Sequence, residues 1–326
     1  MTVGFNPIVV CWQFIFISTI AHLVISCLKI TRELTLPAAN YLKTRIAPTP
    51  SGFLHLGNVL SFAITAELAR RNNAKILLRI DDMDRERVNE QYLQDVFDTL
   101  SFLEIEWHEG PRNMEEFETI YSQLNRLPLY NIYLDKLCQN GKVYACNCSR
   151  KKLNSGAPCN CFDKKLPLDT PDATWRFVTG EESIEVKSYN GEMISAALPT
   201  EMRNFIVRKK DGFPAYQLTS VADDLFYGAD LIVRGNDLWP STLAQHVLAK
   251  ALGRDDFGNI TFYHHPLLTT TSGEKLSKSA GDTSVKYLRE HGSSPAVIYS
   301  MIAQMMGISG AINNWQQLAG KIISLP

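Results

Sequence analysis

Strand-like and helix-like segments alternate between Lys43 and Leu103, and few folds accept that order. Short apolar runs predict strands, and apolar residues that recur at helical spacing predict helices. The first helix is expected to be capped by Asn58. The expected segments are a strand at 43–47, a helix at 58–71, a buried strand at 75–80 and a helix at 89–103. This order predicts a βαβ unit, and therefore an α/β fold with a parallel sheet.

The rest of the chain continues in the same manner, apart from one irregular region. Residues 141–165 hold four closely spaced cysteines among Gly, Pro, Asn and Lys, a composition too irregular for a core. We expect helices at 113–140, 238–252 and 284–326, and strands within 172–187, 204–208 and 231–234. A content of 45% hydrophobic and 21% charged residues is that of a globular protein and excludes a disordered, collagenous or coiled-coil chain.

The overall charge balance does not indicate a nucleic-acid partner. The 326 residues include 33 basic and 34 acidic ones, so at a net charge of −1 any such partner must bind a local patch. Seven cysteines are too few for a disulfide scaffold in a chain of this length. Their clustering indicates metal binding in a reducing compartment, and we expect a cytoplasmic location.

The N-terminal region differs from the rest. Residues 1–28 contain no charged side chain, and the apolar run 8–28 is long enough to span a bilayer. No basic segment precedes this run and no small-residue cleavage site follows it, so it is not a typical secretory signal. We expect residues 1–40 to be an extension outside the functional fold. The alternatives are a membrane anchor at 8–28 and an additional packed helix.

His55 and Gly57 stand at the start of the first predicted helix, after a loop rich in proline and glycine. The unpaired N–H groups and the positive dipole end of a helix N-terminus attract phosphate. Gly57 allows a ligand to approach the backbone, and His55 can donate a hydrogen bond to a phosphoryl oxygen. A nucleotide site is one interpretation, and a solvent-exposed or capping histidine is the other.

A second candidate phosphate-binding segment lies between Gly273 and Gly281. It contains Lys275 and Lys278, whose ammonium groups can neutralise charge on a transferring phosphoryl or adenylyl group. The flanking glycines permit loop movement. The alternative for this segment by itself is a solvated surface loop. The two motifs in this order are more specific than either alone.

The two motifs are similar to the signatures of class I aminoacyl-tRNA synthetases. His55-Leu-Gly-Asn58 resembles the HIGH signature, and Lys275-Leu-Ser-Lys-Ser279 resembles the KMSKS signature. Three further segments resemble the glutamyl-tRNA synthetase family, namely 45–52, 78–87 and 223–238. The chain is identified as a member of that family over about residues 43–290, most similar to its short paralogues, the glutamyl-queuosine tRNA(Asp) synthetases.

The resemblance implies a doubly wound, Rossmann-like catalytic core with an inserted zinc-binding α/β subdomain, a short helical tail and no anticodon-binding domain. The last expectation rests on the 47 residues that follow Ser279. The expected ranges are 1–40 for the extension, 41–137 and 216–283 for the halves of the core, 138–215 for the inserted subdomain and 284–326 for the tail.

The resemblance also implies a glutamate pocket at the ends of strand-like segments. Arg45 would hold the side-chain carboxylate, since a guanidinium pairs with it at two points, and Asp81 would hold the α-ammonium. The full pocket would comprise Arg45, Ala47, Thr49, Asp81, Tyr216 and Arg234. Tyr216 can instead be a core aromatic residue, and Arg234 can form a structural ion pair. The family usually has Glu in place of Asp81 and Ser in place of Thr49.

The implied reaction is ATP-dependent activation of glutamate to glutamyl-adenylate, followed by transfer to tRNA. His55 and Lys278 would be the catalytic residues, because they would stabilise charge on the phosphates, which Mg²⁺ would bridge. The ATP-binding residues would be His55, Gly57, Asn58, Lys275, Leu276, Ser277 and Lys278. No protein nucleophile is required.

The cysteine cluster has a CxC…CxC pattern that can close a tetrahedral Zn²⁺ site. Its members are Cys146, Cys148, Cys159 and Cys161. Four protein ligands leave no open position, so the zinc would be structural. The resemblance supports this interpretation, since family members carry a zinc site in the inserted subdomain, although with Tyr and Cys as the later ligands. Incidental thiols are the alternative.

The resemblance to the short paralogues implies that the acceptor is queuosine in the anticodon loop of tRNA(Asp). One alternative is 3′-end aminoacylation by a glutamate–tRNA ligase that lacks its anticodon domain. Another is a non-catalytic module that binds nucleotide or RNA. Specificity for glutamine instead of glutamate also stays open. We expect a monomer that binds glutamate, ATP and tRNA and has no stable membrane partner.

Overall fold

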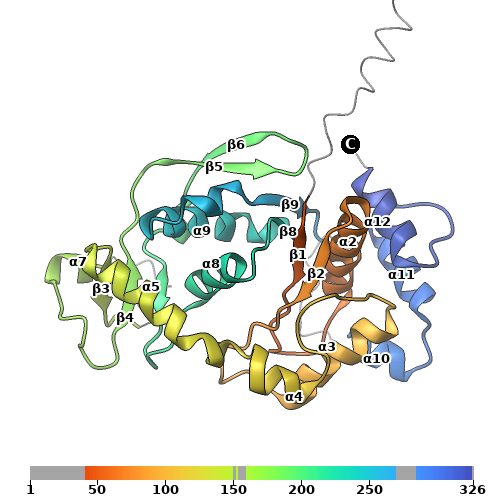
Figure 1. The fold of residues 1–326 in the computed structure, drawn as a ribbon, viewed down its shortest axis with the longest axis horizontal. Coiled ribbons are helices and arrows are strands. Elements are labelled where there is room, and N and C mark those ends of the chain that lie inside the picture. Colours follow the sequence, from red (N-terminus) through yellow and green to blue (C-terminus); the bar gives the residue numbers. More distant parts are fainter. Residues whose placement is uncertain (1–40, 150–151, 153–158, 269–283, 325–326) are drawn as a thin grey trace, which may run out of the picture. The chain divides into compact units, whose positions relative to one another are not determined.

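The computed structural model describes residues 41–149, 152, 159–268 and 284–324 (Figure 1). The predictions for residues 1–40 and for Lys275, Leu276, Ser277 and Lys278 fall outside these ranges. Within the described part, no helix is both long and apolar enough to span a lipid bilayer.

The predicted βαβ unit is confirmed. β1 (Lys43–Ile46) and β2 (Lys75–Leu78) are parallel, with α2 (Leu56–Asn72) between them in the sequence. α3 (Glu90–Phe102) follows β2, and the apolar positions of its sequence face the core. The helical and strand periodicities of residues 43–103 therefore correspond to the elements that form.

The remaining elements largely follow the predicted order. Further helices are α4 (Met114–Glu116), α5 (Leu127–Gln139), α7 (Cys161–Lys164), α8 (Tyr216–Phe226), α9 (Trp239–Ala251), α10 (Val285–Glu290), α11 (Pro295–Met305) and α12 (Trp315–Ile323). Further strands are β3 (Val143–Cys146), β4 (Thr174–Phe177), β5 (Ser183–Ser188), β6 (Met193–Ala197), β7 (Ile206–Arg208), β8 (Leu231–Gly235) and β9 (Thr261–His265). A π-helical turn and a 3-10 turn separate α4 from α5 at Phe117–Tyr121 and Gln123–Arg126. The sequence did not predict β3, β6 or β9, and both β3 and α7 form within residues 141–165, which were expected to be irregular.

The main sheet has the strand order β2-β1-β8-β9-β5-β6. All of these strands are parallel except β6, which pairs antiparallel with β5. The chain passes from β1 to β2 on one side and later adds β8 on the other side of β1, so the strand order reverses there. The predicted α/β class with a parallel sheet is confirmed. Open α/β sheets bind ligands at the carboxyl ends of their strands at such a reversal.

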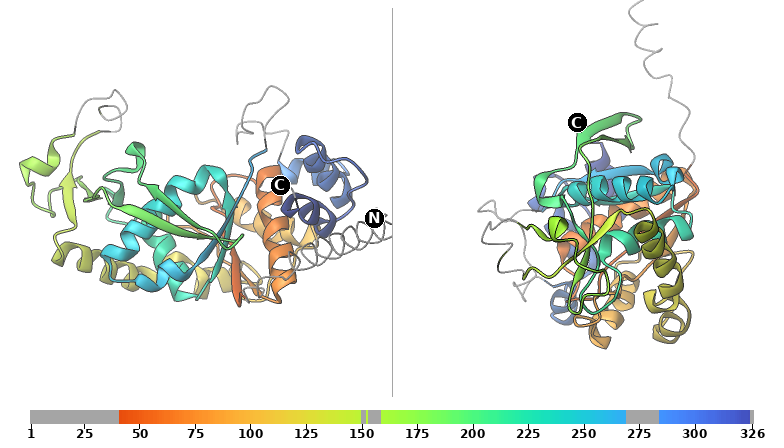
Figure 2. Two further views of the ribbon diagram at one scale, coloured as in Figure 1. Left: turned by 90° about the horizontal axis from the view of Figure 1, so that it is seen from above. Right: turned by 90° about the vertical axis from the view of Figure 1, so that its left-hand side faces the viewer.

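Helices cover both faces of the main sheet, because alternate residues of β8 belong to two different hydrophobic cores. Leu231 and Val233 belong to a core with α2, α3, α11 and α12. Ile232 belongs to a core with α5, α8 and α9. This alternation is the period of two that a strand imposes. Figure 2 shows the blue C-terminal helices beside the orange α2, and both α11 and α12 contact α2. The predicted helical tail is therefore packed against the main core.

A smaller antiparallel sheet, β3-β4-β7, comes from the range predicted as the inserted subdomain. Two other strands of this range, β5 and β6, belong to the main sheet. The limits of the inserted subdomain at residues 138 and 215 stay a prediction. Tyr144, Cys146 and Cys161 form a small buried cluster at β3 and α7. Phe162 packs edge-on against Tyr144, with ring centroids 5.4 Å apart.

Candidate active site and metal centre

A cavity of about 620 Å³ lies where β1 and β8 end and α2 begins. This is the reversal point of the sheet, and the volume is in the range of small-molecule sites, roughly 300–1,000 Å³. The lining residues are Arg45, Ile46, Ala47, Pro48, His55, Gly57, Asn58, Leu60, Ser61, Phe62, Thr65, Arg79, Asp81, Tyr216, Val233, Arg234, Gly235, Asp237, Leu238, His265, Leu267 and Leu268.

His55 caps α2 and lines the cavity. Its Nδ1 accepts the Gly57 N–H at 3.1 Å, and its own N–H donates to Asn58 Oδ1 at 3.0 Å, which completes a capping box. The prediction that Asn58 caps the helix is wrong. The helix begins at Leu56, directly after the capping His55, and the Leu56 side chain is buried in the core. Since Nδ1 accepts, a neutral His55 ring carries its proton on Nε2.

Arg45, Arg79 and Arg234 gather around Asp81 and Asp224, and we call these five buried residues the arginine cluster. Asp224 Oδ1 accepts hydrogen bonds from Arg45 Nε at 3.1 Å and from Arg79 Nη1 at 2.7 Å. Arg79 also pairs at two points with Asp81, at 2.7 and 3.0 Å. Three guanidinium groups meet two carboxylates, so the cluster has one formal positive charge in excess. A buried excess charge favours binding of an oppositely charged group.

Arg234 has donors without partners. Its Nη1 donates to Thr242 Oγ1 at 3.2 Å and to Gln245 Oε1 at 2.9 Å. Its Nε and Nη2 make no hydrogen bond within the described ranges. The guanidinium lies 5.2 Å from the centroid of the Phe262 ring. An unpaired buried donor costs about 1–3 kcal/mol, and an acceptor bound in the cavity would relieve that cost.

The cluster keeps its positive excess at neutral pH. Burial lowers the pKa of Arg234 to about 10, and the nearby Arg45 acts in the same direction, but the group stays protonated. Burial raises the pKa of Asp81 in spite of its pairing with Arg79. The pKa of Asp224 is lowered, because the three arginines together outweigh the burial that would raise it.

Two neutral histidines lie beside the cluster. Burial lowers the pKa of His264 to about 3, and the charge of Arg234 adds to this effect. Burial also lowers the pKa of His265, which lines the cavity. His264 Nε2 lies 2.9 Å from Thr242 Oγ1, and His265 Nε2 lies 3.0 Å from Ser61 Oγ. These rings therefore support polar neighbours without adding charge.

The sequence contains two pairs of adjacent aspartates, Asp81-Asp82 and Asp223-Asp224, and the two members of each pair have different partners. Asp81 and Asp224 belong to the arginine cluster, whereas Asp82 and Asp223 hold the turns before α5. Asp82 accepts hydrogen bonds from the Ser122 hydroxyl and the Gln123 N–H, both at 2.7 Å. Asp223 accepts two from Arg126, at 2.7 and 3.1 Å, and one from the Tyr130 hydroxyl at 2.7 Å. One acid of each pair is thus structural.

Both flanks of the segment with the second predicted motif lie at the cavity. Leu268 is a lining residue, and Ser284 forms an isolated β-bridge with His55. The Val285 N–H donates to Leu54 O at 2.8 Å. The described residues on either side of 269–283 therefore lie beside the first motif, although they are far from it in the sequence.

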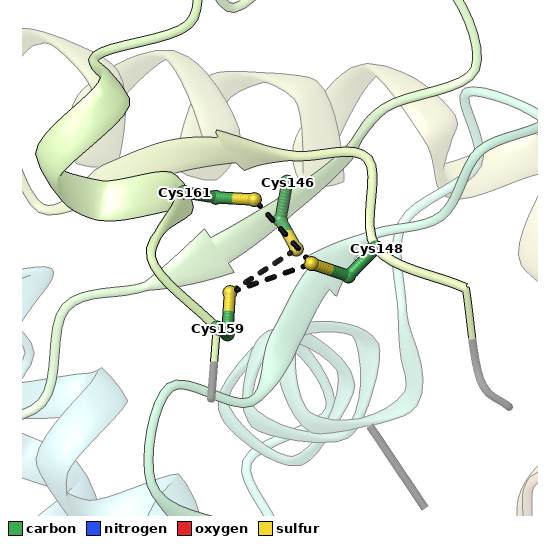
Figure 3. A group of neighbouring side chains, drawn as sticks. All are labelled: Cys146, Cys148, Cys159 and Cys161. Carbon is green, nitrogen blue, oxygen red and sulfur yellow. Dashed lines mark hydrogen bonds between the residues drawn. The ribbon is translucent and has the colours of Figure 1, made fainter. Parts of the chain in front are cut away.

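The four clustered cysteines form a metal-binding arrangement. Their Sγ atoms lie within 4.8 Å of one another and point toward a common centre (Figure 3). The distances are 3.7 Å for Cys146–Cys159, 3.5 Å for Cys148–Cys161 and 3.9 Å for Cys148–Cys159. A tetrahedron with Zn–S bonds of about 2.3 Å has S···S edges of about 3.8 Å, so the thiols fit zinc.

The electrostatics of the thiols differ between Cys146 and Cys148. Burial opposes ionisation of Cys146, but the Cys148 N–H and Arg176 hold its pKa at about 7. Burial and the neighbouring thiols raise the pKa of Cys148 to about 12. A bound metal ion would reverse that effect, because a coordinating thiol loses its proton. Cys138 on α5 is not part of the group.

The family model for tRNA synthetases class I (E and Q), catalytic domain, matches residues 41–162 and 172–320. The chain belongs to this family. Glutamate–tRNA ligases of Treponema denticola and Nitrosococcus oceani are 32% and 33% identical to it over 291 and 285 residues. These alignments cover 82% and 81% of this chain but 56% and 59% of the relatives. The chain thus spans little more than half the length of the curated relatives it matches.

Solved structures in this synthetase family show the same fold. A glutamate–tRNA synthetase of Elizabethkingia anophelis has a TM-score of 0.66 at 23% identity, covering 86% of this chain and 65% of that one. A glutamate–tRNA ligase of Elizabethkingia meningosepticum, in complex with its amino acid, has a TM-score of 0.65 at 21% identity. The family predicted from the two signature motifs is confirmed.

Most of the predicted site residues that the structure describes line one cavity. They are Arg45, Ala47, His55, Gly57, Asn58, Asp81, Tyr216 and Arg234. Thr49 is exposed and lies outside the lining formed by the described residues. Tyr216 is 40% exposed, so it is not a core aromatic residue. The sequence did not single out Arg79 or His265. Arg79 could have been found from the sequence, because it is a charged residue directly after the apolar run of β2.

Proposed function

We propose that this chain activates glutamate with ATP to form glutamyl-adenylate and then transfers the glutamyl group to tRNA. The observation that carries the proposal is the arginine cluster, with its excess positive charge, beside the N-terminus of α2 in one cavity. The cluster suits a dicarboxylic amino acid, and the helix N-terminus suits a nucleotide phosphate. The glutamate–tRNA ligases among its relatives support the same substrates.

Glutamate would bind with its side-chain carboxylate at the arginines. Arg234 supplies the Nε and Nη2 donors that lack partners in the described structure, and Arg45 adds a second positive charge. Asp81 would face the α-ammonium, but it already shares its charge with Arg79. The ammonium would therefore be held less tightly than by a carboxylate without a partner. The proposed pocket keeps Ala47, Tyr216 and the predicted Thr49.

ATP would bind with its phosphates at the start of α2. The glutamate α-carboxylate attacks the α-phosphorus, a new O–P bond forms, and pyrophosphate leaves with the electrons of the broken P–O bond. We propose that His55 Nε2–H donates to a phosphate oxygen and that Gly57 and Asn58 border the nucleotide. Lys275, Leu276, Ser277 and Lys278 are proposed to contact it as well. ATP enters with Mg²⁺, which neutralises phosphate charge.

We propose that the cysteine centre holds a structural Zn²⁺ ion. Three of the Sγ–Sγ distances, at 3.5–3.9 Å, support zinc, and Cys146, Cys148, Cys159 and Cys161 would be its four ligands. Bound zinc would stabilise the junction of β3 and α7, which has few apolar residues of its own. No reaction step involves this ion.

For the acceptor we propose queuosine in tRNA(Asp), which rests on the resemblance of the sequence to the short paralogues. The alternative is glutamylation of the tRNA 3′ end, which the names of the relatives support. In both cases the activated carbonyl is attacked by an RNA hydroxyl and AMP leaves. The two candidates share the adenylate step and differ only in the hydroxyl.

Glutamate-dependent exchange of radiolabelled pyrophosphate into ATP tests the first step, with the full chain and without tRNA. We expect exchange with glutamate and none with glutamine or aspartate. Arg234→Gln should raise the KM for glutamate, whereas Arg208→Gln, beside Trp175 and outside the cavity lining, should not. Absence of exchange with every amino acid, both without tRNA and with tRNA added, would refute the proposal and leave a binding module.

Transfer of labelled glutamate to tRNA from cells with and without queuosine tests the acceptor. Label confined to the queuosine-containing pool supports modification of tRNA(Asp). Equal label in both pools contradicts that acceptor and supports the 3′ end. Prior periodate oxidation of the tRNA cannot distinguish the two acceptors, because it destroys the diols of both the 3′ end and queuosine. The comparison of the two tRNA pools is therefore the decisive measurement.

A further inference from the structure

Asp95 is a buried carboxylate of α3 that touches the residue before His55. It is 2% exposed. Its Oδ2 accepts the Leu54 N–H at 3.1 Å, and its Oδ1 accepts the Thr99 hydroxyl at 3.3 Å. A buried carboxylate is costly unless it is hydrogen-bonded and paired with a positive charge. A positively charged side chain beside Asp95 is therefore needed for the carboxylate to stay ionised and accept the Leu54 N–H.

The positive charge comes from Arg289 on α10. Its Nη2 lies 3.4 Å from Asp95 Oδ1 and 3.5 Å from Asp98 Oδ2. The side chain of Asp95 is 1% exposed and that of Asp98 is 44% exposed, so one cation forms a buried pair and a solvated pair. Water and salt screen the exposed pair, whereas the buried carboxylate depends on its partner. Asp98 is thus a matched control for Asp95.

The start of α10 is also bound to the loop before α2. The Val285 N–H donates to Leu54 O at 2.8 Å, and the Lys286 ammonium lies 4.6 Å from the centroid of the Phe53 ring. The peptide groups on both sides of Leu54 are therefore fixed, one by α3 through Asp95 and the other by α10. His55 follows immediately, so its backbone begins from a fixed position.

We propose that Asp95 is a positioning residue for His55 and that Arg289 acts through Asp95. The inference rests on the proposed function, in which His55 must face the phosphates of ATP. The arginine cluster is built on other elements, namely β1, the end of β2, α8 and β8. Loss of the Asp95 charge should therefore affect the use of ATP and leave glutamate binding unchanged.

Pyrophosphate exchange with variants of the full chain tests this division. Asp95→Asn should lower kcat/KM for ATP about tenfold to one hundredfold, the worth of a charge-assisted hydrogen bond, with an unchanged KM for glutamate. Arg289→Gln should act in the same direction, Arg289→Lys should restore activity, and the double variant should be no worse than Asp95→Asn. Asp98→Asn should behave as wild type. Equal losses for Asp98→Asn and Asp95→Asn, or a matching rise in the glutamate KM, would overturn the proposal.

Amide hydrogen exchange provides a readout that does not need activity. Asp95→Asn should speed exchange of the Gly57 and Val285 amides and leave β1 and β8 unchanged. Unaltered protection of Gly57 would overturn the proposal. If Asp95→Asn does not fold, Arg289→Gln serves instead, because its side chain is 22% exposed. A wild-type chain without pyrophosphate exchange would refute the proposed function, while the amide measurement would still test the positioning of His55.

Discussion

Replacing Gly57 with alanine should abolish most activity without unfolding the protein. An alanine Cβ would lie 2.9 Å from His55 Cε1 and 3.0 Å from His55 Nδ1. Carbon atoms in contact prefer about 3.5–4.0 Å, so the imidazole must move by roughly 0.5 Å or more. The close atoms belong to a side chain and not to the backbone, so we expect the ring to turn away and the helix to stay in place.

The two effects of this substitution on stability nearly cancel. Losing the hydrogen bond from the Gly57 N–H to His55 Nδ1 costs about 1 kcal/mol, the usual worth of a helix cap. Alanine is favoured over glycine inside a helix by about 1 kcal/mol. Activity has no such compensation. A positioned donor to developing charge contributes about 2.7–4 kcal/mol, so we expect kcat to fall about 100-fold or more.

Pyrophosphate exchange and urea denaturation together check this prediction. The matched control is Gly320→Ala in α12, where the nearest atom to the new Cβ is Arg71 Nη2 at an ordinary 3.7 Å. We expect this control to keep full activity and to gain up to about 1 kcal/mol in the free energy of unfolding. Wild-type kcat in Gly57→Ala would refute the reasoning, because the position of His55 would then not matter.

Three further predictions follow from buried charge and from the metal centre. Arg79→Gln leaves two buried carboxylates short of a partner, so the free energy of unfolding should fall by about 3–5 kcal/mol and the KM for glutamate should rise; an unchanged urea midpoint speaks against the cluster. Cys148→Ser should lower the zinc content measured by atomic emission, whereas Cys138→Ser should keep it; zinc-free wild type would rule out the proposed ion. The pKa of His264 is about 3 in the folded chain, below its unfolded value of about 6.5. The unfolded chain therefore binds more protons between these values, so stability should be full above about pH 6.5 and decline toward pH 3 by up to about 1.4 kcal/mol per pH unit. Urea denaturation across this range should show a flatter profile for His264→Gln, and equal slopes would contradict the assignment.

Local sequence predicted most of the helices and strands because their patterns are local. The apolar spacing of α2 and α3 and the apolar runs of β1, β2 and β8 are each contained within one element. β9, with the sequence Thr-Phe-Tyr-His-His, was not predicted because two histidines interrupt its apolar character. β6 was not predicted because four of its five residues are exposed, so no buried face marks it. Both strands exist through their pairing with β5 and β8.

For the site, the sequence by itself determined the motifs, the family and the residues that can bind anions or a metal. Spacing in the sequence suffices for this because a helix start, a CxC pair or a strand end is defined by neighbours along the chain. The sequence also placed His55, the proposed phosphate-binding residue, at the start of a helix, although it named the wrong cap.

Only the tertiary structure decided how the charges pair. Arg45 and Asp224 are 179 positions apart, and Arg79 and Asp224 are 145 apart, yet both arginines donate to one carboxylate oxygen. The energy of a buried charge depends on every charge and dipole near it, and no local pattern records those neighbours. For that reason only the three-dimensional arrangement shows three of the contacts. Arg79 pairs with Asp224, Arg79 partly neutralises Asp81, and Asp95 accepts the Leu54 N–H.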